Sequence, residues 1–90
     1  MLRITEQHAP WRLVLKLEGR IAGEWVAEVE ACWRAATEAN EQESIWIDLT
    51  GVCLVDLAGQ ALLARMHRAG VLFLTRGCLM GELVREISES

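Results

Sequence analysis

Apolar residues recur at every second position in three separate parts of this chain of 90 residues, and this pattern constrains the fold most. The period is clearest in residues 11–18, and residues 2–6 and 45–49 repeat it. A period of two is typical of a strand that buries one face. A short segment with the only proline, Pro10, joins the first two runs, which predicts an antiparallel hairpin.

Between and after these runs the apolar residues change to helical spacing. Residues 24–40 carry apolar residues every third or fourth position, with charged residues opposite them, which predicts an amphipathic helix. A second helix is expected after Asp56, its N-cap candidate, and before Gly70, its expected C′ residue. Residues 71–74 are all apolar and predict a short strand, and Gly77 begins a third predicted helix.

The predicted order is therefore ββαβαβα, an α/β fold in one domain over residues 1–90. Strands that alternate with helices require parallel crossovers after the opening hairpin. Because the strands alternate instead of being wholly apolar, helices should cover mainly one face of the sheet. The residues expected on the other face are Arg12, Val14, Lys16, Trp46 and Asp48. We hypothesise that Trp46 and Val14 form an apolar patch there, used in homodimer formation or docking.

Composition excludes several classes of partner. The net charge of −4 and the pI near 5.1 argue against nucleic-acid binding, which needs a basic face. No apolar run reaches the ~20 residues of a membrane span, and the charged N-terminus is not a signal peptide. Cys32, Cys53 and Cys78 are odd in number and widely spaced, so we expect free, buried thiols in a reducing cytoplasm, and no metal or cofactor site.

Function is expected where the parallel strands end and the helices begin. The loops predicted there are residues 19–23, 50–59 and 75–77. Asp56 can accept backbone N–H bonds at a helix start, and Gly59 allows another backbone to approach closely. Helix capping alone would explain Asp56, so capping and partner binding both stay open at this point.

Three segments in register with these elements carry a family resemblance. They read LKLEGRI at 15–21, IWIDLTGV at 45–52 and VDLAGQALL at 55–63. Together they resemble the STAS domain, the family of bacterial anti-sigma factor antagonists and of the cytoplasmic tails of sulfate-type anion transporters. The resemblance extends over about residues 3–87. Its most specific part is Asp-Leu-Thr at the strand end, followed eight residues after Asp48 by Asp-x-x-Gly.

The resemblance implies a protein-binding surface on which phosphorylation usually controls partner binding. The residues it places on that surface are Asp56, Leu57, Ala58, Gly59, Thr50, Gly51, Gly19 and Ile21. In the family's antagonists, a kinase phosphorylates a Ser or Thr just before the glycine, and phosphate at a helix N-terminus can expel a partner. Here that position is Ala58, which has no hydroxyl. The nearest hydroxyls in the predicted loops are those of Thr50 and Thr75, and either could be a substitute phosphate acceptor.

These observations favour a non-enzymatic interaction module in bacterial signal transduction and transcription regulation. Neither His8 nor His67 joins a catalytic arrangement, and no phosphate-binding loop is present. The expected partner is an anti-sigma factor or switch kinase. The alternatives are a subunit of a larger assembly, such as a lipid-transport ABC system whose ATPase the same surface contacts, and a structural dimer. Nucleotide binding at the predicted loops also stays open.

Charge is distributed unevenly along the chain. Residues 18–43 hold seven acidic and two basic side chains, whereas residues 57–81 hold three arginines and no acid. This asymmetry can orient a protein partner, or it can reflect two unrelated solvated helix faces.

Overall fold

The computed structural model describes residues 2–39 and 44–75. Its elements in chain order are β1 (Leu2–Ala9), β2 (Arg12–Ile21), α1 (Trp25–Ala39), β3 (Ser44–Val55), α2 (Leu57–Arg68) and β4 (Leu72–Leu74). This order confirms the predicted α/β class through the last described strand. The third helix, predicted from Gly77, lies outside the described residues.

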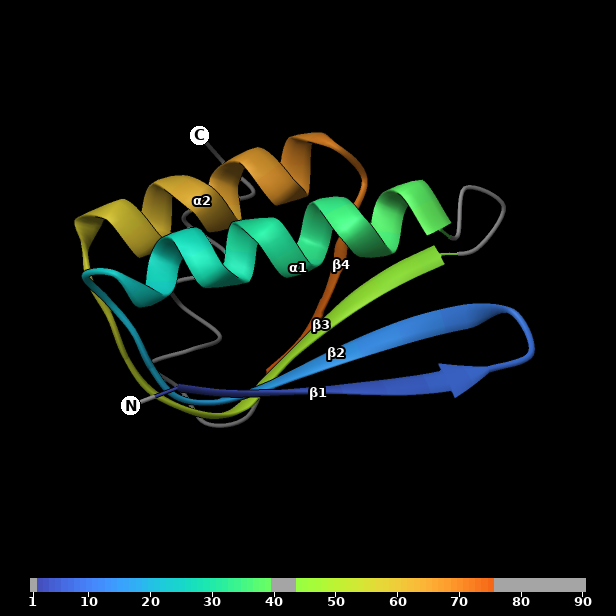
Figure 1. The fold of residues 1–90 in the computed structure, drawn as a ribbon, viewed down its shortest axis with the longest axis horizontal. Helices are drawn as coiled ribbons and strands as arrows, with labels where there is room; N and C mark the ends of the chain where they lie inside the picture. Colours follow the sequence, from blue (N-terminus) through green and yellow to red (C-terminus); the bar gives the residue numbers. More distant parts are fainter. Residues whose placement is uncertain (1, 40–43, 76–90) are drawn as a thin grey trace.

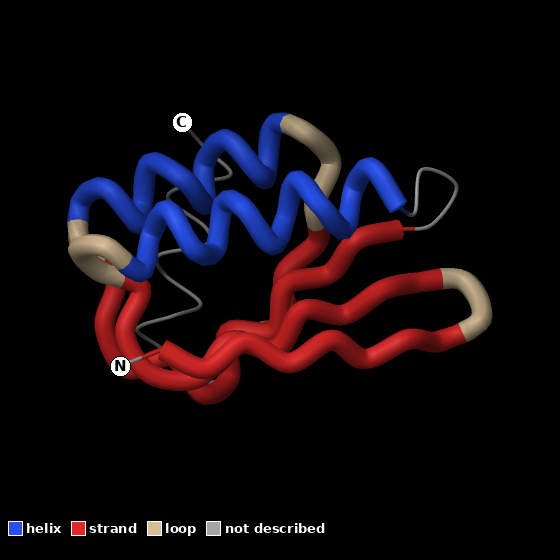
Figure 2. Tube along the Cα trace, in the orientation of Figure 1, coloured by secondary structure: helices blue, strands red, loops and turns tan. Residues whose placement is uncertain are grey.

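The strands form one sheet in the order β1-β2-β3-β4. β1 and β2 pair antiparallel as the predicted hairpin, and β2–β3 and β3–β4 pair parallel. Both described helices lie side by side on the same face of the sheet, as expected (Figure 1). Coloured by secondary structure, the tube shows this helix layer over the strand layer (Figure 2).

The core lies between the sheet and the two helices. Its fully buried side chains alternate along β2 and β3 and recur at helical spacing in α2, as the apolar periods require. They include Leu13, Leu15, Leu17, Ile21, Ile47, Leu49, Leu62, Leu63 and Met66. α1 contributes less, because only Val29 and Ala36 are buried while Trp25 and Trp33 pack against the core from its edge. The two described helices therefore contribute unequally to this core.

Two strands run further than their sequences predict. β3 continues through Thr50 and Gly51, where we expected it to break, and β2 continues through Gly19 to Ile21, where we expected a loop. The extension is possible because the β2–β3 register shifts twice, between Lys16 and Glu18 and again after Gly19. Such irregularities bend and twist a strand without ending its pairing. The predicted loops at residues 19–23 and 50–59 are correspondingly shorter.

The prediction of buried cysteines is wrong for Cys53. Its side chain is exposed because it alternates along β3 with the buried Val52, although its Sγ lies 3.4 Å from the carbonyl oxygen of Gly19. Cys32 is partly buried, and both thiols are free as predicted. Burial and neighbouring carboxylates raise the pKa of Cys32, which keeps this thiol protonated and unreactive at neutral pH. Cys78 lies outside the described residues.

The face of the sheet away from the helices is less apolar than the core face. Trp46 is partly exposed there, and the Arg12 guanidinium carbon lies 5.4 Å from its ring centroid, within cation–π range. Val14 differs from expectation, because it is only 6% exposed and adds little surface to the predicted patch. It is the cross-strand partner of Trp46 on the adjacent strand.

Candidate functional site

Two of the three predicted functional loops, residues 19–23 and 50–59, meet where β2 and β3 lead into the two helices, at the left in Figure 1. In the third, only Thr75 lies within the described residues. We call residues 22–24 and 54–59 the rim. At its centre, Asp56 is the N-cap of α2, as the sequence predicts, and its Oδ1 accepts a hydrogen bond of 2.7 Å from the Gly59 N–H. Its Oδ2 accepts a second, of 2.9 Å, from the Gly23 N–H in the β2–α1 loop. One carboxylate therefore ties the start of α2 to the start of α1.

These two N–H donors also change the acidity of the carboxyl group. The hydrogen bond from Gly23 and then that from Gly59 lower the pKa of Asp56 from its ordinary value. A carboxylate with such bonds is favoured over the acid because only the charged form accepts both. We call these two hydrogen bonds the Asp56 clamp. Both are therefore present at neutral pH.

Asp56→Asn should lower the unfolding midpoint at neutral pH, because the amide offers one acceptor oxygen to two donors. The folded state has the lower pKa, so the carboxylate's contribution is full above the ordinary carboxyl pKa and is lost as pH falls through the lowered value. Thermal unfolding followed by circular dichroism should thus show a difference between wild type and D56N that shrinks in acid. The matched Glu38→Gln change on exposed α1 surface should leave the midpoint unchanged at both pH values. A D56N difference independent of pH would contradict the clamp.

Gly59 is required by a close backbone approach, which the sequence also predicts. The residue is buried, and a Cβ at this position would lie 2.6 Å from the carbonyl oxygen of Ile21 and 2.8 Å from Val55 Cγ1. The same carbonyl accepts a hydrogen bond from the Asp56 N–H at 3.1 Å. The Asp-x-x-Gly motif is thus architectural, since its two named residues fix α2 against the end of β2.

The residues between Asp56 and Gly59 are presented to solvent. Leu57 is 83% exposed, and Ala58 beside it is exposed as well. Leu54, which precedes them on β3, is 48% exposed. The clamp therefore holds an apolar tip outward in a fixed position. Leu54, Leu57 and Ala58 are therefore three exposed apolar side chains within five residues of the chain.

The other predicted site residues fall elsewhere. Ile21 is fully buried and contributes its backbone carbonyl instead of its side chain. Gly19 and Gly51 lie within paired strands, and Thr50 donates from its hydroxyl to Asp48 Oδ1 at 2.6 Å. Thr75 is exposed just after β4. Sequence reasoning did not single out Gly23, because nothing in the sequence shows which backbone N–H a carboxylate will reach 33 residues away.

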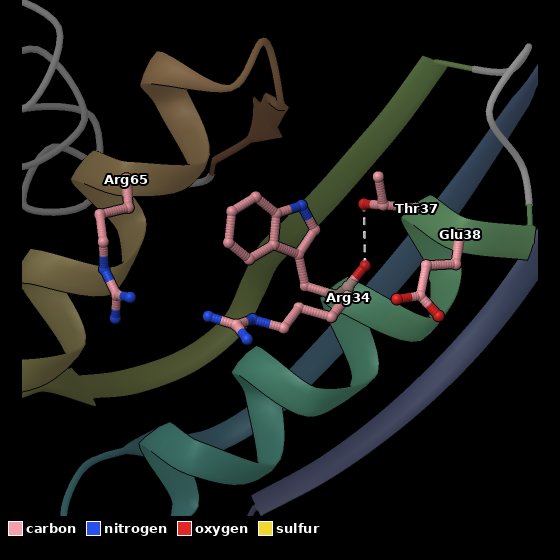
Figure 3. Close-up of a pocket in the computed structure, with 5 residues that line it drawn as sticks. Arg34, Thr37, Glu38 and Arg65 are labelled. Carbon is pink, nitrogen blue, oxygen red and sulfur yellow. Dashed lines mark hydrogen bonds between the residues drawn. The ribbon is translucent and has the colours of Figure 1, made fainter.

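Charges of the two helices pair with each other. Glu30 of α1 binds Arg65 of α2 at 2.7 Å and Arg34 of its own helix at 3.1 Å. Figure 3 shows Arg34 and Arg65 reaching into one groove from the two helices. Ion pairs within the molecule therefore neutralise part of the charge that is unevenly distributed along the sequence.

That groove has a volume of about 360 Å³ and is lined by Trp33, Arg34, Thr37, Glu38 and Arg65. Its two arginines face two glutamates, Glu30 and Glu38, so it has no excess charge to attract an anion. Among the described residues, no three histidine, cysteine, aspartate or glutamate side chains lie close enough to hold a metal ion. Neither helix in residues 2–39 and 44–75 is long and apolar enough to cross a membrane.

Comparison with known proteins identifies the architecture. No family model matches the sequence, and no curated protein matches it. An anti-sigma factor antagonist from Mycobacterium paratuberculosis is similar in structure, with a TM-score of 0.68 at 18% identity over 86% of this chain and 69% of that one. The unphosphorylated anti-sigma factor antagonist SpoIIAA gives a TM-score of 0.68 at 19% identity over 92% and 82%.

A third solved structure, the STAS domain of an anti-sigma factor antagonist from Rhodobacter sphaeroides, gives a TM-score of 0.55. Its identity is 19%, over 84% of this chain and 86% of that one. The three structures cover between 84% and 92% of this chain. The protein therefore has the STAS-domain fold of the anti-sigma factor antagonists.

Proposed function

We propose that this protein is a non-enzymatic interaction module of the anti-sigma factor antagonist type. It acts in the cytoplasm, where its rim binds an anti-sigma factor or a related switch kinase. The observation that carries the proposal is the pairing of an 83% exposed Leu57 with the Asp56 clamp that fixes it. Because the backbone that carries Leu57 is already held in place, less conformational entropy is lost when a partner covers the leucine, which favours binding.

Exposed leucines gather at this rim. The described residues include four large, exposed apolar side chains, and two of them, Leu54 and Leu57, belong to the rim. The fold is consistent with this proposal, since three of the similar solved structures are of anti-sigma factor antagonists. The flanking charges, Arg20 and Glu24, are of opposite sign, so apolar contact contributes more of the affinity here than net charge.

Binding would not be controlled by phosphate at the usual position. Ala58 offers no hydroxyl, and its neighbour Leu57 offers none either. The chain would then stay in its partner-binding form whatever the activity of the kinase. Incubation with an anti-sigma kinase and ATP should leave residue 58 unmodified by mass spectrometry, and phosphate at Thr50 or Thr75 would show that the switch has moved.

The partner can be identified by photo-crosslinking in the source cell. A benzophenone amino acid at position 57 should capture a protein with a kinase-type ATP-binding domain. The matched probe at Ala35, exposed on α1 and away from the rim, should not. Capture of an ABC ATPase at position 57 would instead favour a role as a subunit of a transport assembly.

Two results would contradict the proposal. Equal capture at positions 57 and 35 would show that the rim is not the contact surface. Capture of a second copy of this chain at position 57 would show that the rim serves self-association. In either case the fold assignment would stand, because it does not depend on the partner.

A further inference from the structure

A second apolar feature crosses the open face of the sheet, the face away from both described helices. Val14, Trp46 and Leu72 are successive cross-strand partners on β2, β3 and β4. We call these three residues the open-face row. Leu72 is 45% exposed and Trp46 partly exposed, whereas Val14 is nearly buried although it lies outside the core cluster. The row is thus a continuous apolar strip that ends in an exposed leucine.

The row is bordered mainly by positive charge. On β2, Arg12 and Lys16 lie two positions before and after Val14, which puts both on the same face as the row. Arg12 already stacks over Trp46. The one acidic neighbour, Asp48, faces Lys16 across the strands, and its Oδ1 accepts bonds from the Thr50 backbone and hydroxyl. The charges beside the row therefore sum to one positive charge, and Arg12 is the cation without an acidic cross-strand partner.

The size of the open-face row favours a short segment over a second copy of the chain as its partner. A stable interface between two protein copies buries roughly 800 Å² on each side. One leucine 45% exposed beside a partly exposed indole offers far less apolar area than that. The row is large enough for one or two apolar anchors from a single segment, which is how short amphipathic segments bind.

We propose that the open-face row binds an amphipathic segment of another protein, in which carboxylates flank one or two large apolar side chains. The apolar anchors would contact Trp46 and Leu72, and the carboxylates would pair with Arg12 and Lys16. This surface is separate from the rim, which lies at the starts of the two helices, where β2 and β3 end. The module would then hold two proteins at once.

Two synthetic peptides test the proposal directly on the full chain. Both carry leucines at helical spacing, and their flanking residues are glutamate in one and lysine in the other. The glutamate peptide should bind about tenfold more tightly by fluorescence anisotropy, and its affinity should fall as salt is added. In heteronuclear NMR spectra it should shift the Trp46 indole N–H, assigned with Trp46→Phe, and the Leu72 amide.

Variants of the chain measure separately how much charge and how much apolar contact contribute to peptide binding. The double variant Arg12→Glu and Lys16→Glu should reverse the preference, so that the lysine peptide binds more tightly. Leu72→Ser should weaken the glutamate peptide about tenfold, as the loss of a central anchor does. The matched Leu57→Ser change, on another exposed leucine, should leave peptide affinity unchanged while it removes the rim contact. Failure of the rim proposal and of this one would therefore be distinguishable.

Several results would overturn the proposal. These are equal affinity for both peptides, absence of binding, or shifts confined to the rim amides. A dimer that Trp46→Ala abolishes in analytical ultracentrifugation would assign the row to a second copy of the chain. Nuclear Overhauser contacts between the Trp46 indole and residues 76–90 of the free protein would assign it to the chain's own C-terminal segment.

Discussion

Gly59→Ala is expected to lower the free energy of unfolding by about 1–3 kcal/mol, the usual cost of overpacking, although alanine is the better helix former. The added methyl group would lie 2.6 Å from the Ile21 carbonyl oxygen. That oxygen cannot move away cheaply, because it accepts the hydrogen bond from the Asp56 N–H. The start of α2 must shift instead, and the clamp loosens with it. Urea unfolding followed by tryptophan fluorescence measures the change.

The control for Gly59→Ala is Ala61→Ser in the same helix. Ala61 is exposed, so this change should stay within about 0.5 kcal/mol of wild type. Because the shift of α2 also moves Leu57, Gly59→Ala should reduce photo-crosslinking at position 57 as well. An unfolding free energy equal to or above that of wild type would show that the close approach of α2 to β2 is not required.

Leu62→Ala should have the larger effect, a loss of about 2–5 kcal/mol, which is typical for a buried leucine cut to alanine. Leu62 is fully buried where α2 packs on the sheet. Domains of this size have only about 5–15 kcal/mol of stability in total, so the variant should be strongly destabilised.

The same substitution at Leu57 is the matched control. Leu57 lies in the first turn of the same helix but is 83% exposed, so Leu57→Ala should change stability by less than about 0.5 kcal/mol. The two variants separate two parts of α2, since Leu62 is buried in the core and Leu57 is the residue proposed to contact a partner. Similar losses of stability for both would mean that Leu57 is covered in solution.

Much of the fold follows from local pattern. Period-two runs predicted the strands of the hairpin and the first half of β3, and helical spacing predicted α1 and α2. Asp56 was predicted as the N-cap of α2, and Gly70 as its C′ residue, where the structure has φ of +94°. These features depend on residues close together in the chain, which is why the sequence alone reveals them.

Strand ends were harder to predict, because they depend on the partner strand. Thr50 and Gly51 resemble a turn, yet Gly51 fits within β3 because it has no side chain to strike Glu18 or the Leu17 carbonyl. The exposure of Val14 was misjudged for the same reason, whereas Cys53 was expected to be buried because free cysteines usually are. Alternation gives the face on which a side chain lies, but the neighbouring strand decides how much of that side chain is covered.

The sequence by itself determined the α/β class, the helix layer on one face of the sheet and the motif at positions 56–59. Only the tertiary structure joined Asp56 to Gly23, buried Ile21 and left Leu57 exposed. It also aligned Val14, Trp46 and Leu72 across three neighbouring strands, although these residues are far apart in the sequence. The physical reason is that apolar periods specify which side of each element is buried. The surfaces that a partner would contact arise only where separate elements meet.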